Sequence, residues 1–241
     1  MRVMREPRNK LELSGLPGLR SGRVLEPEVM DDAEEVDAYL DGVATAHLDR
    51  MDDTFVTSAL TKLRGRGPWR ALDLGTGTGA IPVKMVLRRP GLFMVGLDRS
   101  AAMLLSARRR GREADVQDRL RFKKADGRRL PFPDRSLDLV VCNSVLHHIP
   151  DPAQVFDEIA RVLKRDGALF IRDLRRPHPS VIRRHIREHG RYYRGTMLRL
   201  FSDSVRAAFT ESELKGVVAR SGLRRARVRR MFATYLVVES T

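Results

Sequence analysis

The sequence predicts an α/β fold, in which a doubly wound, mainly parallel sheet carries helices on both faces. Three observations predict it. A short apolar run, Ala71–Leu74, leads into the glycine-rich segment Gly75–Gly79, as a strand buried on both faces does when it turns tightly into a helix. A second apolar run, Leu92–Asp98, follows one helix length later. Strand and helix patterns then alternate as far as residue 174, which is typical of parallel sheets.

The first 64 residues are expected to lie outside this sheet. Residues 1–25 mix basic residues with glycine and proline, which predicts an irregular arm. Helical spacing of apolar residues over Met30–Leu63 predicts helices that cover the site, and residues 65–68, Gly-Arg-Gly-Pro, break the chain before the first strand. We therefore expect an N-terminal arm and helical cap over 1–64 and the main domain over 65–241.

Within the main domain, the elements follow from apolar periodicity and turn residues. Pro82 suits the first turn of a helix, where its missing N–H costs nothing, and Asp166-Gly167 is a turn. The predicted strands are Trp69–Leu74, Leu92–Asp98, Arg121–Ala125, Leu137–Asn143 and Ala168–Leu174. The predicted helices between them are Ala80–Arg88, Ala101–Val116 and Ala153–Lys164.

The C-terminal third divides into an insertion and a closing unit. His178–Ser202 is basic and aromatic with two glycine interruptions, which predicts a partly helical segment on the ligand side. A capping box at residues 210–213 opens a helix, Leu214–Arg220, that ends at Gly222. The remaining apolar runs predict a terminal hairpin, with strands over Leu223–Met231 and Thr234–Glu239.

The formal net charge of +15 is spread unevenly. The stretch from Glu26 to Asp53 contains eleven acidic residues and one basic residue, whereas Arg172–Arg194 contains eight arginines and two acidic residues. Six further arginines lie between Arg220 and Arg230 with no acid among them. Such a face suits RNA or an anionic substrate, and it equally suits an arginine-rich protein surface with no such partner.

Composition also limits the location and the metal chemistry. No apolar run approaches the ~18 residues that span a bilayer, and no signal-peptide segment opens the chain, so we expect a cytoplasmic protein without a membrane span. Cys142 is the only cysteine, which excludes an intrachain disulfide and a cysteine-based metal cluster. We expect Cys142 to be a small buried side chain and the site to hold no metal.

The glycine segment predicts a nucleotide-cofactor site. Asp73 precedes the glycines and Asp98 ends the second strand, where an acid can accept both hydroxyls of a ribose. A dinucleotide fingerprint has the spacing G-x-G-x-x-G, but here the spacing is G-x-G-x-G, and we expect Asp73 to point into the site. An acid beside the loop disfavours a pyrophosphate and favours a cofactor that carries a cationic amino acid.

These residues resemble the class I S-adenosylmethionine-dependent methyltransferases, in particular the group that includes the ubiquinone and menaquinone biosynthesis enzymes. The resemblance covers residues 65–175. It rests on Leu72–Gly79, on Asp98, on Lys124-Ala-Asp-Gly127 at the end of the third strand, on Phe132–Asn143 and on the loop Ser144–Pro152. The sequence lacks the Phe-Gly-Leu-Arg-Asn stretch of the quinone enzymes, so a quinone acceptor is not supported.

The resemblance implies a Rossmann-like fold of seven strands in the order 3-2-1-4-5-7-6, with S-adenosylmethionine as the cofactor. It implies that the cofactor is bound by Asp73, Gly75, Thr76, Gly77, Gly79, Asp98, Arg99, Met103, Asp126, Gly127, Asn143 and Ser144. His147 and His148 are the candidate catalytic bases, because imidazole titrates near neutrality and this loop should lie beside the reacting methyl group. Weaker candidates are Arg172, Asp173, Tyr192 and Tyr193.

Three functions remain open at this stage. The leading one is methyl transfer to a small-molecule metabolite. A tRNA or rRNA methyltransferase would use the basic C-terminal face, although Asn143–Leu146 is not the Asn-Pro-Pro-aromatic sequence typical of transfer to exocyclic amines of nucleic acids. A non-catalytic module would use cofactor occupancy only to order an RNA- or protein-binding surface. The sequence does not indicate the acceptor atom or the oligomeric state.

Overall fold

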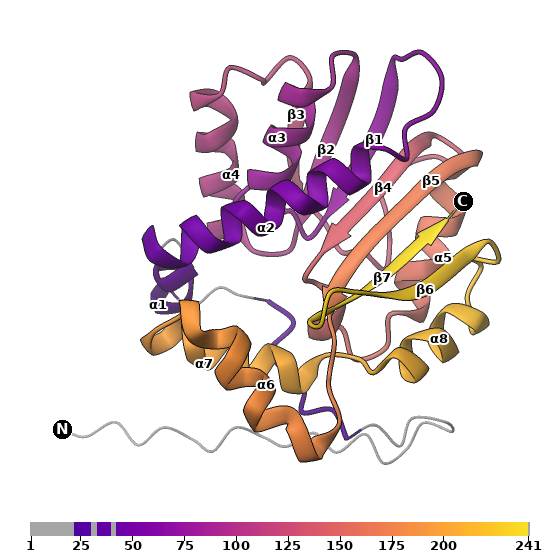
Figure 1. The fold of residues 1–241 in the computed structure, drawn as a ribbon. Coiled ribbons are helices and arrows are strands. Elements are labelled where there is room, and N and C mark those ends of the chain that lie inside the picture. Colours follow the sequence, from indigo (N-terminus) through magenta and orange to yellow (C-terminus); the bar gives the residue numbers. More distant parts are fainter. Residues whose placement is uncertain (1–21, 30–32, 40–41, 241) are drawn as a thin grey trace.

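The centre of the molecule is the predicted seven-stranded sheet. The computed structural model describes residues 22–29, 33–39 and 42–240. The strand order is β3-β2-β1-β4-β5-β7-β6, and only β7 runs antiparallel to its neighbours (Figure 1). The strands are β1 Trp69–Leu74, β2 Leu92–Asp98, β3 Leu120–Lys124, β4 Leu137–Asn143, β5 Leu163–Leu174, β6 Ala226–Met231 and β7 Tyr235–Ser240. The fold class and the strand order are therefore confirmed.

Helices cover both faces of the sheet. One face is covered by α2 and α3, with α4 beside α3; the other is covered by α5 and α8. The longer helices are α1 Ala33–Tyr39, α2 Gly42–Leu60, α3 Ala80–Arg88, α4 Ala101–Glu113, α5 Ala153–Val162, α6 Ile182–His189, α7 Gly195–Ala207 and α8 Glu211–Arg220. Buried Cys142 belongs to the α5/α8 layer, as expected for a small apolar side chain.

Several element ends differ from the predicted ones for local reasons. Helix α4 ends at Glu113 rather than Val116 because Asp115 takes a left-handed conformation, with φ 50°. Strand β5 begins at Leu163, but its pairing with β4 jumps from there to Ala168. The predicted turn at residues 166–167 is thus an interruption within one strand. The predicted capping box is present at the start of α8.

The carboxyl ends of the parallel strands form one edge of the sheet, and a second group of segments lies over this edge. In Figure 1, α1, α6 and α7 lie beyond these strand ends, with residues 22–29 close to α7. The insertion is more helical than predicted, because α7 continues to Ala207. Most of the predicted arm, residues 1–21, lies outside the described residues.

Helix α2 combines two roles. Phe55, Val56 and Ala59 are fully buried against α3 and the sheet, so the second half of α2 belongs to the core layer. Its first half extends toward α1 and the carboxyl edge (Figure 1). The division of the chain at residue 64 stays a prediction.

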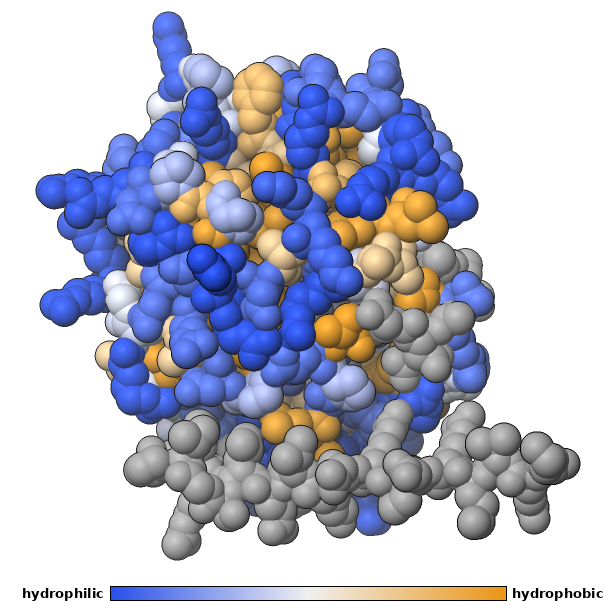
Figure 2. All heavy atoms as spheres, turned by 180° about the vertical axis from the view of Figure 1, so that it is seen from behind, coloured by the Kyte–Doolittle hydropathy of each residue, from blue (hydrophilic) through white to orange (hydrophobic). Residues whose placement is uncertain are grey.

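The outer surface is mainly polar. Seen from behind, hydrophilic side chains cover most of that face and apolar ones form small groups between them (Figure 2). Among the helices of the described ranges, none has the length and hydropathy that a bilayer crossing requires. Strand β6 lies at the edge of the sheet, and its arginines Arg227, Arg229 and Arg230 are exposed.

Candidate active site

A cavity of about 260 Å³ opens at the carboxyl edge, where strands β1 and β4 lie side by side. In open α/β sheets this point, where the winding direction reverses, is the usual place for a ligand. Twelve of the residues predicted for the site line the cavity. They are Gly75, Thr76, Gly77, Asp98, Arg99, Met103, Asp126, Gly127, Asn143, Ser144, His147 and His148.

The glycine loop brings backbone close to the loop that follows β4. A Cβ on Gly75 would lie 2.2 Å from Cγ2 of Val145, and the φ of Gly75 is 70°. Gly77 has φ 51° and nothing within 4 Å of a Cβ, so its backbone faces open space. Its N–H donates to Oδ2 of Asp98 at 2.8 Å. Only glycine accepts the close approach at 75 without displacing Val145.

Asp73 and Gly79 do not line the cavity, which corrects the expectation that Asp73 points into it. Thr76 Oγ1 donates to Asp73 Oδ2 at 2.7 Å and separates this carboxyl group from the open space. Burial raises the pKa of Asp73 to about 7. Gly79 is a packing residue, since a Cβ there would lie 2.9 Å from Phe122 and 3.0 Å from Ala107.

Asp98 is held at the tip of β2. Besides the Gly77 contact, its Oδ1 accepts the N–H of Ser100 at 2.9 Å, at the start of α4. These two contacts hold the carboxylate at the carboxyl end of β2. Its predicted role as a ribose acid stays a prediction.

A cluster of charges lies beside Asp98. Arg128 donates to Asp126 Oδ2 at 2.8 Å and to Glu28 Oε2 at 3.0 Å. Arg99 also pairs with Glu28. The hydrogen bonds from Arg128 hold the pKa of Asp126 below its usual value, although burial opposes them. Glu28 thus connects the N-terminal segment to the part of the cavity near Asp98.

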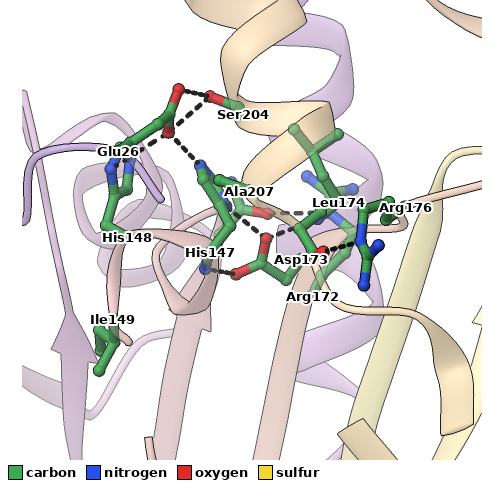
Figure 3. A network of polar contacts seen from close by, with 12 residues as sticks. Glu26, His147, His148, Ile149, Arg172, Asp173, Leu174, Arg176, Ser204 and Ala207 are labelled. Carbon is green, nitrogen blue, oxygen red and sulfur yellow. Dashed lines mark hydrogen bonds and ion pairs between the residues drawn. The ribbon is translucent and has the colours of Figure 1, made fainter. Parts of the chain in front are cut away.

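His147 lies in the 3-10 turn after β4 and is held by a buried carboxylate. Its Nδ1 is 2.5 Å from Oδ1 of Asp173, and its backbone N–H donates to Oδ2 of Asp173 at 3.2 Å (Figure 3). Burial works against the charged form of His147, but the charge of Asp173 and the hydrogen bond outweigh it and raise the pKa of His147. Because Nδ1 is paired with Asp173, Nε2 is the ring nitrogen that could accept a proton from a substrate.

Glu26 faces both histidines. Its Oε2 is 3.8 Å from Nε2 of His147 and 3.4 Å from Nδ1 of His148, and the hydroxyl of Ser204 donates to it at 3.2 Å (Figure 3). Burial raises the pKa of Glu26 to about 7. Burial, together with the charge of His147, lowers the pKa of His148 to about 3. His148 is therefore neutral near physiological pH.

Arg172 joins the sheet to α2. Its Nε donates to Oδ1 of Asn143 at 2.9 Å, and its Nη1 donates to the Met51 carbonyl at 3.0 Å and to Thr54 Oγ1 at 2.8 Å. Burial lowers the pKa of this guanidinium. Asn143 lines the cavity, yet its carbonyl oxygen already has this partner.

The part of the cavity next to the histidines and Arg172 is lined mainly by apolar and aromatic side chains. Asp52 is an exception, and burial raises its pKa to about 6. Tyr193 is buried and lines the cavity, whereas Tyr192 lies outside it and stacks on His47 with ring centroids 4.3 Å apart. The apolar and aromatic lining comprises Tyr39, Leu48, Met51, Tyr193, Met197, Leu200, Phe201 and Tyr235.

Sequence reasoning missed the N-terminal contribution to the site. Glu26 and Glu28 begin the acidic stretch that was noted for its charge, but no motif marks them. Arg23 was also missed: its Nε donates to the Ala207 carbonyl at 2.6 Å, and its Nη2 to the His147 carbonyl at 3.0 Å. The pairing of His147 with Asp173 joins one strong and one weaker candidate that the sequence left unconnected.

Residues 72–171 match the family model of a methyltransferase domain. They form a class I S-adenosylmethionine-dependent methyltransferase domain. This domain contains the glycine loop, Asp98 and both histidines, and the resemblance stated from the motifs is confirmed. The model ends before the insertion and the terminal hairpin, and it begins after the N-terminal segment and α2.

Two curated relatives each match about half of this chain. The 27-O-demethylrifamycin SV methyltransferase of Amycolatopsis mediterranei is 38% identical over 48% of this chain and 44% of its own length. The demethylmenaquinone methyltransferase of Lactobacillus johnsonii is 34% identical over 51% of this chain and 50% of its own length. The chain thus spans about half the length of these relatives.

The fold is shared with solved structures. A geranyl diphosphate methyltransferase in complex with S-adenosylmethionine superposes with a TM-score of 0.60, at 18% identity, over 88% of this chain and 95% of the other. At this identity the likeness concerns the fold. It extends over far more of the chain than the family model does.

Proposed function

We propose that this chain transfers the methyl group of S-adenosylmethionine to a small, largely apolar molecule. One observation carries the proposal: a single cavity is lined by the glycine loop and Asp98, by His147, and by a group of apolar and aromatic side chains. The cofactor would lie along Gly75, Gly77 and Asp98, and its sulfonium supplies an activated methyl group. The protein then has to place a nucleophile in line with that group and accept any proton released.

His147 is the residue we propose as the general base. Asp173 fixes the tautomer of His147 through Nδ1, which leaves the lone pair on Nε2, and His147 lines the cavity. The same pairing orients the ring and stabilises the imidazolium once it has formed. An acceptor with an ionisable hydroxyl would use this base, whereas an acceptor that is already deprotonated would not need it.

A radiolabelled methyl-transfer assay against a small-metabolite extract and against total RNA tests the function. We expect label in the metabolite fraction. The variant Asp98→Ala should weaken cofactor binding by about 1–3 kcal/mol in calorimetry, because the ribose hydroxyls would lose a charged hydrogen-bond partner. His147→Ala should keep cofactor affinity and lose turnover. Unchanged cofactor affinity in Asp98→Ala would show that Asp98 does not bind the ribose. Label found in RNA alone would show that the acceptor is RNA and not a small molecule.

The basic insertion is the observation that favours an RNA acceptor instead. Arg183, Arg184 and Arg187 are exposed on α6, although Arg184 pairs with Glu188 at 2.7 Å. The aromatic lining of the cavity favours the small molecule, because it can enclose an apolar body. The RNA arm of the assay decides between the two.

A further inference from the structure

We propose that Glu26, His147 and His148 form a binding site for one divalent transition-metal ion of the Zn²⁺ type. The three residues come from distant parts of the chain and present their ligand atoms to one another. Nε2 of His147, Nδ1 of His148 and Oε2 of Glu26 face a common point, and one ligand atom from each residue lies within 4.8 Å of the others. No motif in the sequence marks this site, because position 26 lies more than a hundred residues from the histidines.

The separations suit a metal better than they suit hydrogen bonds. Oε2 of Glu26 is 3.8 Å from Nε2 of His147 and 3.4 Å from Nδ1 of His148. A tetrahedral ion with bonds of about 2.0–2.1 Å has ligand–ligand edges of about 3.3–3.4 Å. Both distances from Oε2 of Glu26 are within about 0.5 Å of such an edge, and all three ligand atoms lie within 4.8 Å of one another, so a modest contraction of the cluster would bring them to one ion.

The surroundings provide the second shell that such sites have. Asp173 accepts from Nδ1 of His147 at 2.5 Å, and a carboxylate on the far nitrogen is the usual way to orient a metal-bound imidazole. Ser204 donates to Glu26 at 3.2 Å and would hold its carboxylate in place. His148 would bind as the tautomer with its proton on Nε2, giving up the 3.1 Å contact between its Nδ1 and the carbonyl oxygen of Pro27.

Charge balance also favours a cation at this point. The side chain of Glu26 is 9% exposed, and within the described part of the chain only the two imidazoles lie at ion-pair distance from it. Arg23 lies nearby, but its guanidinium donates to the carbonyls of His147, Ile149 and Pro150 rather than to Glu26. A divalent ion would compensate this buried carboxylate more fully than His147 does, because the charge of that imidazole is already shared with Asp173.

Two imidazoles and one carboxylate leave a coordination position open. This donor set suits Zn²⁺ and its neighbours in the transition series better than Mg²⁺ or Ca²⁺, which prefer oxygen alone. The ion would occupy the lone pair on Nε2 of His147 that the proposed base uses. Ion binding and proton abstraction by His147 are therefore alternatives, and the ion would switch off base catalysis.

Titration of the chelator-treated full chain with Co²⁺, followed by visible absorption, tests the site without any methyl-transfer assay. We expect one ion per chain with the strong absorption of a tetrahedral site, displaced by Zn²⁺. Glu26→Gln and His148→Ala should abolish this absorption, and Asp173→Asn should weaken affinity about 10- to 100-fold, as loss of a second-shell carboxylate does. Circular dichroism and thermal unfolding show whether each variant is folded.

His185→Ala is the matched control, because His185 and His189 form the other close histidine pair among the described residues, with ring centroids 4.5 Å apart on α6. This variant should titrate like the intact chain. Absorption that disappears in His185→Ala, or that persists in folded Glu26→Gln, would overturn the proposal. So would an intact chain that binds Co²⁺ without tetrahedral absorption. Each readout is independent of whether methyl transfer is found.

Discussion

At the scale of single residues, the site places ionisable groups where water cannot reach them. Asp73 is the clearest case, since it is 1% exposed and accepts a hydrogen bond from the neutral hydroxyl of Thr76. An acid in such a position favours its protonated form, and its pKa is about 7 instead of 3.8. Between about pH 4 and pH 7, Asp73 therefore keeps its proton in the folded protein, whereas the unfolded chain has released it.

We expect Asp73→Asn to stabilise the cofactor-free protein, and to do so increasingly as pH rises. Below about pH 4 Asp73 is neutral in both states, so the variant should match the parent; up to about pH 7 the parent should lose stability that the amide keeps. Thermal unfolding at several pH values measures the difference. Asp134→Asn, at a position 73% exposed, is the control. A gain in stability that is the same at every pH would contradict the claim that the carboxyl group of Asp73 is buried and protonated.

At the scale of elements, the segment 22–29 connects the two ends of the cavity. Arg23 holds it to the turn after β4, and Glu28 holds it to Arg99 and Arg128 near Asp98. A short segment without a helix or strand of its own depends on such contacts for its order.

Cofactor binding should therefore increase the hydrogen-exchange protection of residues 22–29 and of α1, because the ligand adds contacts beneath them. The second half of α2 should not change, since Phe55, Val56 and Ala59 are already in the core. Exchange measured by mass spectrometry with and without S-adenosylmethionine checks this. Glu28→Gln should reduce the gain, and Glu113→Gln, at an exposed position of α4, should leave it intact. Equal protection with and without S-adenosylmethionine would show that residues 22–29 are already fully ordered in the cofactor-free protein.

The difference between local and distant information also explains what the sequence could predict. The strands followed from apolar runs and turn residues, and their order followed from the family resemblance that the motifs carry. Each of these signals is local in the sequence. The pairing of His147 with Asp173 spans 26 residues, and the contact of Arg23 with the His147 carbonyl spans 124. Neither leaves a periodic or spacing signal. The position of Asp73 behind Thr76 depends on one side-chain rotamer, which no pattern records.

At the scale of the whole molecule, the net charge of +15 is concentrated on exposed arginines, several of them on α6 beside the carboxyl edge. A surface of this kind attracts any polyanion at low ionic strength, whatever its biological role.

We expect RNA to bind only at low salt and to receive no methyl group. If Arg183, Arg184, Arg187, Arg191 and Arg194 did contact phosphates, neutralising two of them would flatten the dependence of log affinity on log salt by about two. Filter binding over a range of salt concentrations, with methyl incorporation measured in parallel, distinguishes the cases. RNA held at physiological salt, with incorporation that the double arginine variant loses, would reverse the choice of acceptor.

The placement of residues 22–29 has an evolutionary consequence. One stretch of eight residues contacts Arg128 through Glu28 and the proposed base His147 through Glu26. If the proposed function holds, substitutions in this stretch should alter donor affinity and acceptor preference together. The sheet and its motifs need not change for this to happen. Exchanging this stretch between related chains is therefore a compact way to diversify the enzyme, and a library restricted to it would sample new acceptors at little cost to folding.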